Sequence, residues 1–175
     1  MKKAKSYLLD FEIDRLTNSI VNTVSGDSFP TDVSLLIKVD LKQVQRSNGW
    51  LFNWREELQS IDRETYKLTI VNNPTIVQGA LSMTINTDHV FIHLIENAPF
   101  NRNKTKIYEG VSGNLVAFAC KISFQRGGAG FVSFQAKTKL IDHYIDTLGA
   151  CHFGNHLMVI DTTGAHKLVD KYFKN

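Results

Sequence analysis

Two neighbouring stretches of alternating apolar residues constrain the fold more than any other feature. Apolar or small side chains occupy every second position from Val77 to Ile85, and a second strand-forming stretch runs from His89 to Ile95. A period of two is typical of β-strands, and Asn86-Thr87-Asp88 between them is a turn signal. The pattern therefore predicts an antiparallel hairpin. Similar alternation predicts two earlier strands, Val33–Val39 and Tyr66–Ile70.

The remaining segments predict helices and short strands. Leu9, Ile13, Leu16, Ile20 and Val24 recur at three- and four-residue steps, which predicts an N-terminal helix ending near Gly26. Helices are also predicted over Trp50–Leu58, from about Gly113, and over Lys139–Leu148, where Gly149 is the C-terminal cap. Strands are predicted over Phe131–Phe134 and in a hairpin of Cys151–Phe153 and Leu157–Ile160. A closing helix is predicted with one apolar face, made of Ala165, Leu168, Val169 and Tyr172. This order predicts a mixed α/β domain with helices packed on a largely antiparallel sheet.

Composition excludes several classes of protein. The 175 residues contain no repeat or linker, so a single domain is expected. The formal charge is only +3 and the basic residues are scattered, which argues against a dedicated nucleic-acid binder. No stretch approaches the ~20 apolar residues of a membrane span, and the first ten residues lack a signal-peptide core, so a cytoplasmic protein is expected. Cys120 and Cys151 lie in apolar stretches without metal-ligand spacing, which predicts two reduced core thiols and no metal.

The segment from Leu94 to Cys120 carries the clearest chemical signal. A strand leads into a basic loop, then into Gly110-Val111-Ser112-Gly113 and an amphipathic helix. Small residues let the backbone approach a ligand, and the first N–H groups of a helix can receive a phosphate. Basic residues just before the turn would attract a polyanion: Arg102, Lys104 and Lys106. An ordinary glycine loop with a solvated basic surface is the alternative interpretation. The spacing matches neither a Walker motif nor a dinucleotide-binding fingerprint.

Two motifs in this half of the chain resemble those of the GNAT acyltransferases. Ile107-Tyr108-Glu109-Gly110-Val111-Ser112, followed by Gly113-Asn114-Leu115, stands where that family has its pyrophosphate loop and helix start. Tyr144-Ile145-Asp146-Thr147-Leu148-Gly149-Ala150 takes the place of its later Tyr-x-x-x-Leu-Gly motif. The resemblance covers roughly 77–160. It departs at Ile107, where the family has Arg or Gln, at Ser112, and at Lys137, where the family often has Asn.

The resemblance implies a GNAT-like fold over residues 1–175, with an extra N-terminal helix. Residues 77–160 would form the acyl-CoA-binding core, and residues 1–60 a helical region on the acceptor side. The implied reaction is direct transfer of an acetyl group from acetyl-CoA to an amine, with no covalent enzyme intermediate and no metal. The implied cofactor-binding residues are Leu94, Ile95, Glu96, Tyr108, Glu109, Gly110, Val111, Ser112, Gly113, Asn114 and Lys137.

Two residues are candidates for acid–base catalysis. Tyr144 takes the place of the family's general acid, which protonates the leaving thiolate, although it also fits the apolar stripe of its helix. Glu96, at the end of a predicted strand, is the candidate base, with His93 as a weaker alternative and a solvated glutamate as the simpler interpretation. Cys120 has no paired histidine and is not expected to be a nucleophile. Acceptor-site candidates that also suit the core are Trp50, Phe52 and Trp54.

Three functions remain open from the sequence. The first is an acetyl-CoA-dependent N-acetyltransferase acting on an unidentified amine. The second is a catalytically inactive, GNAT-like coenzyme A-binding or regulatory protein, which the departures at Ile107 and Lys137 favour. The third is a nucleic-acid-binding module using the basic loop, against which the low net charge counts. No membrane or nucleic-acid partner is expected, and a homodimer is left open.

Overall fold

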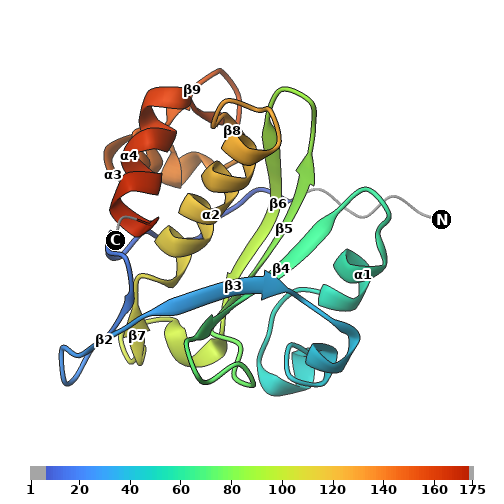
Figure 1. The fold of residues 1–175 in the computed structure, drawn as a ribbon, viewed down its shortest axis with the longest axis vertical. Coiled ribbons are helices and arrows are strands. Elements are labelled where there is room, and N and C mark those ends of the chain that lie inside the picture. Colours follow the sequence, from blue (N-terminus) through green and yellow to red (C-terminus); the bar gives the residue numbers. More distant parts are fainter. Residues whose placement is uncertain (1–6, 174–175) are drawn as a thin grey trace.

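The computed structural model describes residues 7–173, which form a seven-stranded sheet flanked by helices (Figure 1). Side by side, its strands are β3 (Thr31–Leu35), β4 (Glu64–Ile70), β5 (Gly79–Ile85), β6 (Val90–Asn97), β8 (Val132–Gln135), β10 (Leu157–Ile160) and β9 (Cys151–His152). A smaller sheet has the order β2 (Ser28–Phe29), β1 (Ile20–Asn22) and β7 (Tyr108–Glu109). Described neighbours are antiparallel, apart from the parallel pair of β6 and β8.

Four α-helices and four short 3-10 helices complete the described chain. The α-helices are α1 (Trp54–Gln59), α2 (Val111–Gln125), α3 (Ile141–Leu148) and α4 (Thr162–Phe173). The 3-10 helices are Lys38–Lys42, Arg46–Asn48, Pro99–Asn101 and Thr138–Leu140. In Figure 1, α2 lies across the sheet with α4 beside it, and both helices contact strands of the sheet. Gly149 ends α3 at a φ of 66°, in the left-handed conformation predicted for it.

The predicted hairpin forms the centre of the sheet. Strands β5 and β6 pair antiparallel from Gly79–Asn97 to Ile85–Val90. Leu81, Met83 and Ile92 on these strands are at most 1% exposed, because helices and strands cover them. Burial of side chains of this size supplies most of the favourable free energy of folding, at about 25 cal/mol per Å² of apolar surface. The prediction of a mixed α/β domain with a mostly antiparallel sheet is confirmed.

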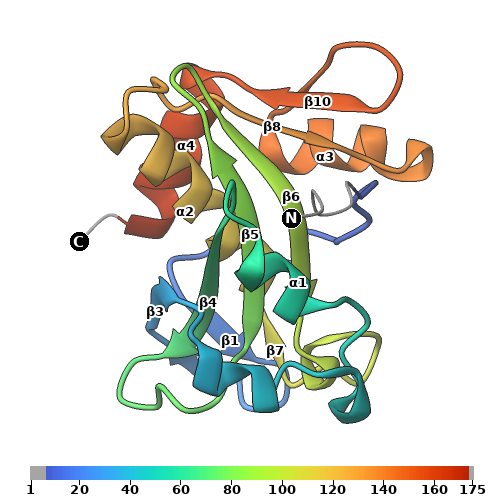
Figure 2. The same cartoon turned by 90° about the vertical axis from the view of Figure 1, so that its right-hand side faces the viewer.

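The parallel strands β6 and β8 pair over two residues and then separate. Their register pairs Val90 with Val132 and Phe91 with Ser133. Figure 2 shows β6 running down the sheet while β8 crosses toward α3. Beyond Phe91, β6 keeps its ladder with β5 on one side, and among the described strands nothing pairs with its other edge. The separation opens the sheet between the ends of the two strands.

Residues 9–19, here called the N-terminal segment, lie beside this opening and contain no helix. The prediction of an extra N-terminal helix is therefore wrong. Leu9, Phe11 and Ile13 are buried, whereas the residues between them are exposed, which is the period of an extended chain. The Leu9 N–H donates to the Gln135 carbonyl at 2.7 Å, and the Lys137 N–H donates to the Leu9 carbonyl at 3.0 Å. Pairing with the end of β8 decides the conformation over the helical spacing of the same apolar residues.

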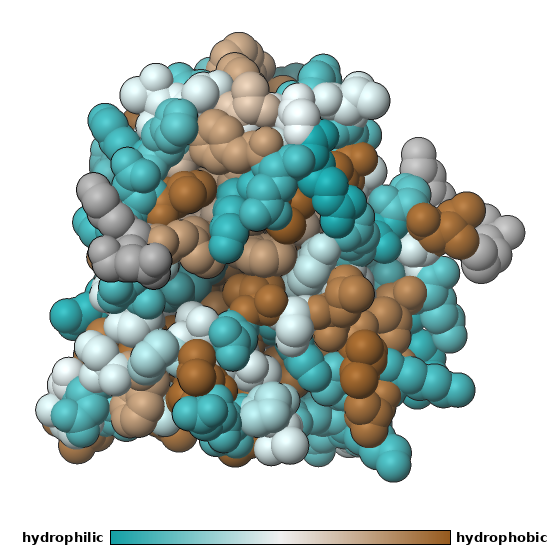
Figure 3. Space-filling view, in the orientation of Figure 1, coloured by the Kyte–Doolittle hydropathy of each residue, from teal (hydrophilic) through white to brown (hydrophobic). Residues whose placement is uncertain are grey.

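Two smaller predictions also change. The strand predicted over Val33–Val39 ends at Leu35, where a 3-10 helix follows. Apolar side chains gather over the end of β3 (Figure 3), and Leu35 and Val39 are exposed there. Cys120 is buried as predicted, but Cys151 is exposed because it lies on β9, at the edge of the sheet. None of the helices described is long and apolar enough to cross a membrane.

Candidate active site

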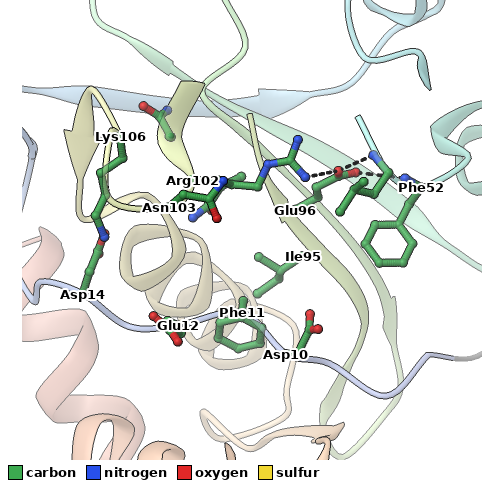
Figure 4. Close-up of a pocket in the computed structure, with 13 residues that line it drawn as sticks. Asp10, Phe11, Glu12, Asp14, Phe52, Ile95, Glu96, Arg102, Asn103 and Lys106 are labelled. Atoms are coloured by element: carbon green, nitrogen blue, oxygen red, sulfur yellow. Dashed lines mark hydrogen bonds and ion pairs between the residues drawn. The ribbon is translucent and has the colours of Figure 1, made fainter. Parts of the chain in front are cut away.

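A cavity of about 330 Å³ occupies the opening between β6 and the N-terminal segment. Figure 4 shows Asp10, Phe11 and Glu12 of the segment on one side and Ile95 and Glu96 of β6 on the other. Residues 51–52 and 101–106 close the remaining sides. Side chains of both charges therefore surround a space that reaches the unpaired edge of β6.

Glu96 lines this cavity, but its carboxylate already has several hydrogen-bond donors. It accepts from the Leu51 N–H at 2.6 Å, the Phe52 N–H at 3.3 Å and the Trp54 indole N–H at 2.8 Å. The Arg102 guanidinium lies 3.6 Å away. Burial raises the pKa of Glu96, while these hydrogen bonds and Arg102 oppose the rise. The carboxylate therefore holds the chain before α1 against the end of β6.

This arrangement bears on the prediction that Glu96 is the general base. A base must present a free lone pair to the proton that it removes. Three donors from residues 51–54 compete for the lone pairs of Glu96, so the geometry favours a positioning role. His93, the alternative base, lies earlier on β6 and has Nε2 2.6 Å from the Thr84 hydroxyl, outside the cavity lining.

Tyr144 is fully buried on α3, between Phe11 and Phe134. Its hydroxyl donates to the Phe11 carbonyl at 2.6 Å. Burial, followed by the charges of Asp10 and Glu12, raises the pKa of Tyr144 far above its ordinary value. The residue occupies the core position that its helix stripe predicts, and its hydroxyl points at the N-terminal segment. Its assignment as the general acid stays a prediction.

The start of α2 also meets the N-terminal segment. Gly110 is the N-cap at a φ of 97°, and its N–H donates to the Asp14 carboxylate at 3.0 Å. The other oxygen of Asp14 lies 2.9 Å from Lys106 Nζ. An anion at the first turn of a helix is stabilised by the unpaired N–H groups and by the helix dipole. The segment therefore places its own anion where the sequence predicted a phosphate.

Small residues at this helix start admit the backbone of the segment. A Cβ on Gly110 would lie 2.9 Å from the Ser19 carbonyl, and one on Gly113 would lie 3.1 Å from the Arg15 carbonyl and would clash with the Tyr172 hydroxyl. The Asn114 side-chain amide donates to the Ser19 carbonyl at 3.2 Å. In this structure the N-terminal segment, and not a ligand, approaches the small residues at this helix start.

The other predicted cofactor-binding residues lie in four places. Leu94 and Ile95 are buried on β6, and Ile95 lines the cavity. Tyr108 and Glu109 form β7, which pairs with β1 just after the N-terminal segment. The remaining residues are Val111 and Ser112, buried in the first turn of α2, and Lys137, whose Nζ lies 2.7 Å from Asp10.

The aromatic candidates for the acceptor site divide between core and cavity. Trp50 and Trp54 are at most 3% exposed, so they are core residues. Phe52 is partly buried and lines the cavity. Two lining residues, Phe11 and Asp14, were missed because their segment was predicted to be helical. The alternation of Leu9, Phe11 and Ile13 was the available signal.

Comparison with solved structures identifies the fold. A spermidine N-acetyltransferase from Vibrio cholerae, solved with CoA and spermine, matches with a TM-score of 0.57 at 14% identity, over 78% of this chain and 98% of that chain. The ribosomal-protein-S18-alanine N-acetyltransferase from Escherichia coli matches with a TM-score of 0.50 at 15% identity, over 74% and 90%. The chain has the GNAT fold. No family model and no curated protein matches its sequence.

The GNAT fold confirms the predicted fold class and the resemblance on which it rested. In sequence order, the strand that ends at the cavity, helix α2, strand β8 and helix α3 follow one another as the two motifs implied. Sequence identities of 14–15% support a shared fold and do not assign a shared substrate or activity.

Proposed function

We propose that this protein is an acetyl-CoA-dependent N-acetyltransferase acting on an amine. The observation that carries the proposal is the separation of β6 from β8 beyond Phe91, with a cavity against the unpaired edge of β6. Unpaired N–H and C=O groups on a strand edge can receive an extended amide chain by strand-like hydrogen bonding. The pantetheine arm of coenzyme A contains such amides, and the thiol end would then lie in the opened sheet.

The surrounding residues suit the two charged reactants. Lys106 and Arg102 on the cavity rim suit a diphosphate, and the carboxylates of Asp10 and Glu12 suit a cationic amine. Holding both reactants together removes much of the entropic barrier of a two-substrate reaction. Glu96 would keep the chain before α1 in place as the acceptor-side wall. Tyr144 is the candidate proton donor to the departing thiolate once its hydroxyl is released from Phe11.

A catalytically inactive GNAT-like protein is the second candidate, and a specific observation favours it. Val111 and Ser112 in the first turn of α2 are at most 1% exposed, and Asn114 is 4% exposed. The Ser112 hydroxyl is buried against Asn97 of β6. The N-terminal segment covers the neighbouring part of the predicted diphosphate site through Asp14 on Gly110 and Ser19 on Asn114. A protein that keeps this cover at all times would bind no coenzyme A.

Acetyl-CoA itself separates the two candidates. A ligand that binds only the folded state raises the melting temperature as its concentration exceeds its Kd. We expect millimolar acetyl-CoA to raise the melting temperature, and a panel of primary amines and polyamines to gain an acetyl group detected by mass spectrometry. A thiol reagent would also label the exposed Cys151, so a coupled assay needs the Cys151→Ser variant. Binding without turnover on any amine selects the inactive candidate, and an unmoved melting curve rejects coenzyme A binding.

A further inference from the structure

The N-terminal segment contacts, in sequence order, the residues that the resemblance assigns to acetyl-CoA. Its Leu9 carbonyl accepts from the Lys137 N–H, and its Phe11 carbonyl accepts from the Tyr144 hydroxyl. Further along, the Asp14 carboxylate accepts from the Gly110 N–H. Its last contacts are the approach of the Arg15 carbonyl to Gly113 and the Thr17 and Ser19 carbonyls that accept from Asn114.

Asp14 provides the closest chemical match to a ligand. Its carboxylate lies between a backbone N–H at a helix start and the Lys106 ammonium, at 3.0 Å and 2.9 Å. Phosphate oxygens are bound by the same two kinds of donor. The Asp14 side chain is 15% exposed, so the contact is partly shielded from water. The Asp14 carboxylate therefore occupies a site that would also suit a phosphate group.

The segment is attached by separate contacts rather than by a long ladder. Its backbone forms an isolated bridge between Leu9 and Ala136. Each of its other hydrogen bonds to α2, α3 and α4 involves a side chain on one of the two sides. Elements with short pairing and side-chain anchors open at a lower free energy than central strands do. The cavity on its inner side already separates the segment from β6.

We propose that the N-terminal segment is an autoinhibitory strap, which acetyl-CoA displaces when it binds. The strap holds the first turn of α2 and the Tyr144 hydroxyl in a closed state, with Asp14 in place of the diphosphate. This inference rests on the proposed function, since it requires that acetyl-CoA bind at this site. The apparent affinity for acetyl-CoA is reduced by the fraction of molecules that are closed.

The Asp14→Asn variant tests the strap with little change in shape. Asparagine can still accept from the Gly110 N–H, but it loses the charge that pairs with Lys106. Charge-assisted hydrogen bonds stabilise more than neutral ones, so we expect acetyl-CoA to bind about tenfold more tightly to Asp14→Asn than to the wild type. Asp27→Asn, which removes the same charge from an exposed turn outside the cavity, is the matched control and should stay within about twofold.

Two measurements on the 175-residue chain test the strap. Calorimetric titration gives the Kd of acetyl-CoA, and ADP serves as a second ligand that carries the diphosphate without the pantetheine arm. Hydrogen exchange of the wild type reports residues 9–19 directly, whether or not the variants fold. The strap predicts faster exchange there when acetyl-CoA binds, and a similar but smaller change with ADP.

The outcomes distinguish the strap from the proposed function. Acetyl-CoA binding with unchanged or slower exchange over residues 9–19 overturns the strap and leaves the proposed function standing. Equal affinities of Asp14→Asn and the wild type also overturn it. If acetyl-CoA at millimolar concentration binds neither protein, both proposals fail together.

Discussion

The N-terminal segment and the β5–β6 hairpin are stabilised in different ways. The hairpin buries a continuous set of apolar side chains and pairs from Gly79–Asn97 to Ile85–Val90, with one register shift between Ser82 and Met83. The segment buries alternate side chains and is attached at separate points, through Leu9, Phe11 and Asp14. The hairpin therefore belongs to the cooperative core, whereas the segment can open while the core stays folded.

The largest expected difference is between two truncations, one in each region. Leu81→Ala removes a fully buried side chain from β5, and we expect a loss of about 3–4 kcal/mol in the free energy of unfolding. Phe11→Ala removes a larger ring, but its cost is limited by the free energy of detaching the segment, about 2 kcal/mol or less. Urea denaturation measures both losses. A greater loss for Phe11→Ala would show that the segment belongs to the core and cannot act as a strap.

Hydrogen exchange extends this comparison. We expect Leu81→Ala to lower protection throughout the sheet, because it lowers the free energy of global unfolding. Phe11→Ala should lower protection over residues 9–19 and the first turn of α2 alone. Loss of protection in β5 and β6 of the Phe11 variant would contradict the division into two regions.

The two carboxylates Glu96 and Asp14 provide a second, smaller contrast. Both accept backbone N–H groups, but Glu96 is 4% exposed and lies in the core. Glu96→Ala leaves donors of Leu51, Phe52 and Trp54 without their acceptor, so we expect a loss of about 2–3 kcal/mol. Glu96→Gln keeps one acceptor oxygen and should lose less. Tryptophan fluorescence during urea denaturation follows both variants.

A small effect of Glu96→Ala would change the assignment of this residue. If stability fell by less than about 0.5 kcal/mol, the carboxylate would not be holding the chain before α1. Glu96 would then be available as the general base that its place on β6 suggests. Loss of turnover without loss of stability would support that alternative directly.

The sequence predicts the core far better than it predicts the segment. Strands β4, β5 and β6 and helices α2 and α3 carry periodic apolar patterns that agree with their tertiary surroundings. Residues 9–19 carry two patterns at once, because Leu9 and Ile13 fit a helix whereas Leu9, Phe11 and Ile13 fit a strand. Pairing with Gln135 and Lys137, more than 120 residues away in sequence, decides between them. No local pattern contains that information.

The candidate site shows the same limit. The sequence singled out the glycine turn, Glu96 and Tyr144; in the structure Glu96 lines the cavity, whereas Gly110 and Tyr144 contact the N-terminal segment beside it. From the sequence, the hydrogen bonds of these residues were assigned to an external ligand. A motif shows which donors and acceptors are present, but it does not show which partner they bind. Here Asp14 and the Phe11 carbonyl are the partners.

Gly110→Val shows why this difference matters for experiments. From the sequence, a bulky residue at Gly110 should weaken coenzyme A binding more than folding. In the structure, the positive φ of Gly110 and the nearby Ser19 carbonyl make any side chain costly for the fold itself. That variant cannot separate binding from stability, and Asp14→Asn can.

The smallest expected effect on stability comes from Tyr144→Phe, which removes one hydroxyl at the junction of the two regions. The variant keeps the packing against Phe11 and Phe134 but leaves the buried Phe11 carbonyl without its donor. We expect a loss of about 1–2 kcal/mol in stability. From the sequence, a purely catalytic role of Tyr144 predicts an almost unchanged melting temperature, so calorimetry distinguishes the two expectations.

The same variant separates the strap from catalysis. Loss of the hydroxyl loosens the N-terminal segment, so acetyl-CoA should bind several-fold more tightly. If Tyr144 is also the proton donor, kcat should fall by about 10²–10⁴-fold. Tyr66→Phe is the matched control, because its hydroxyl donates to Glu64 within β4 and does not contact the segment. Tighter binding with an unchanged kcat would assign Tyr144 to holding the segment, and weaker binding would contradict the strap, because closure would then not compete with acetyl-CoA.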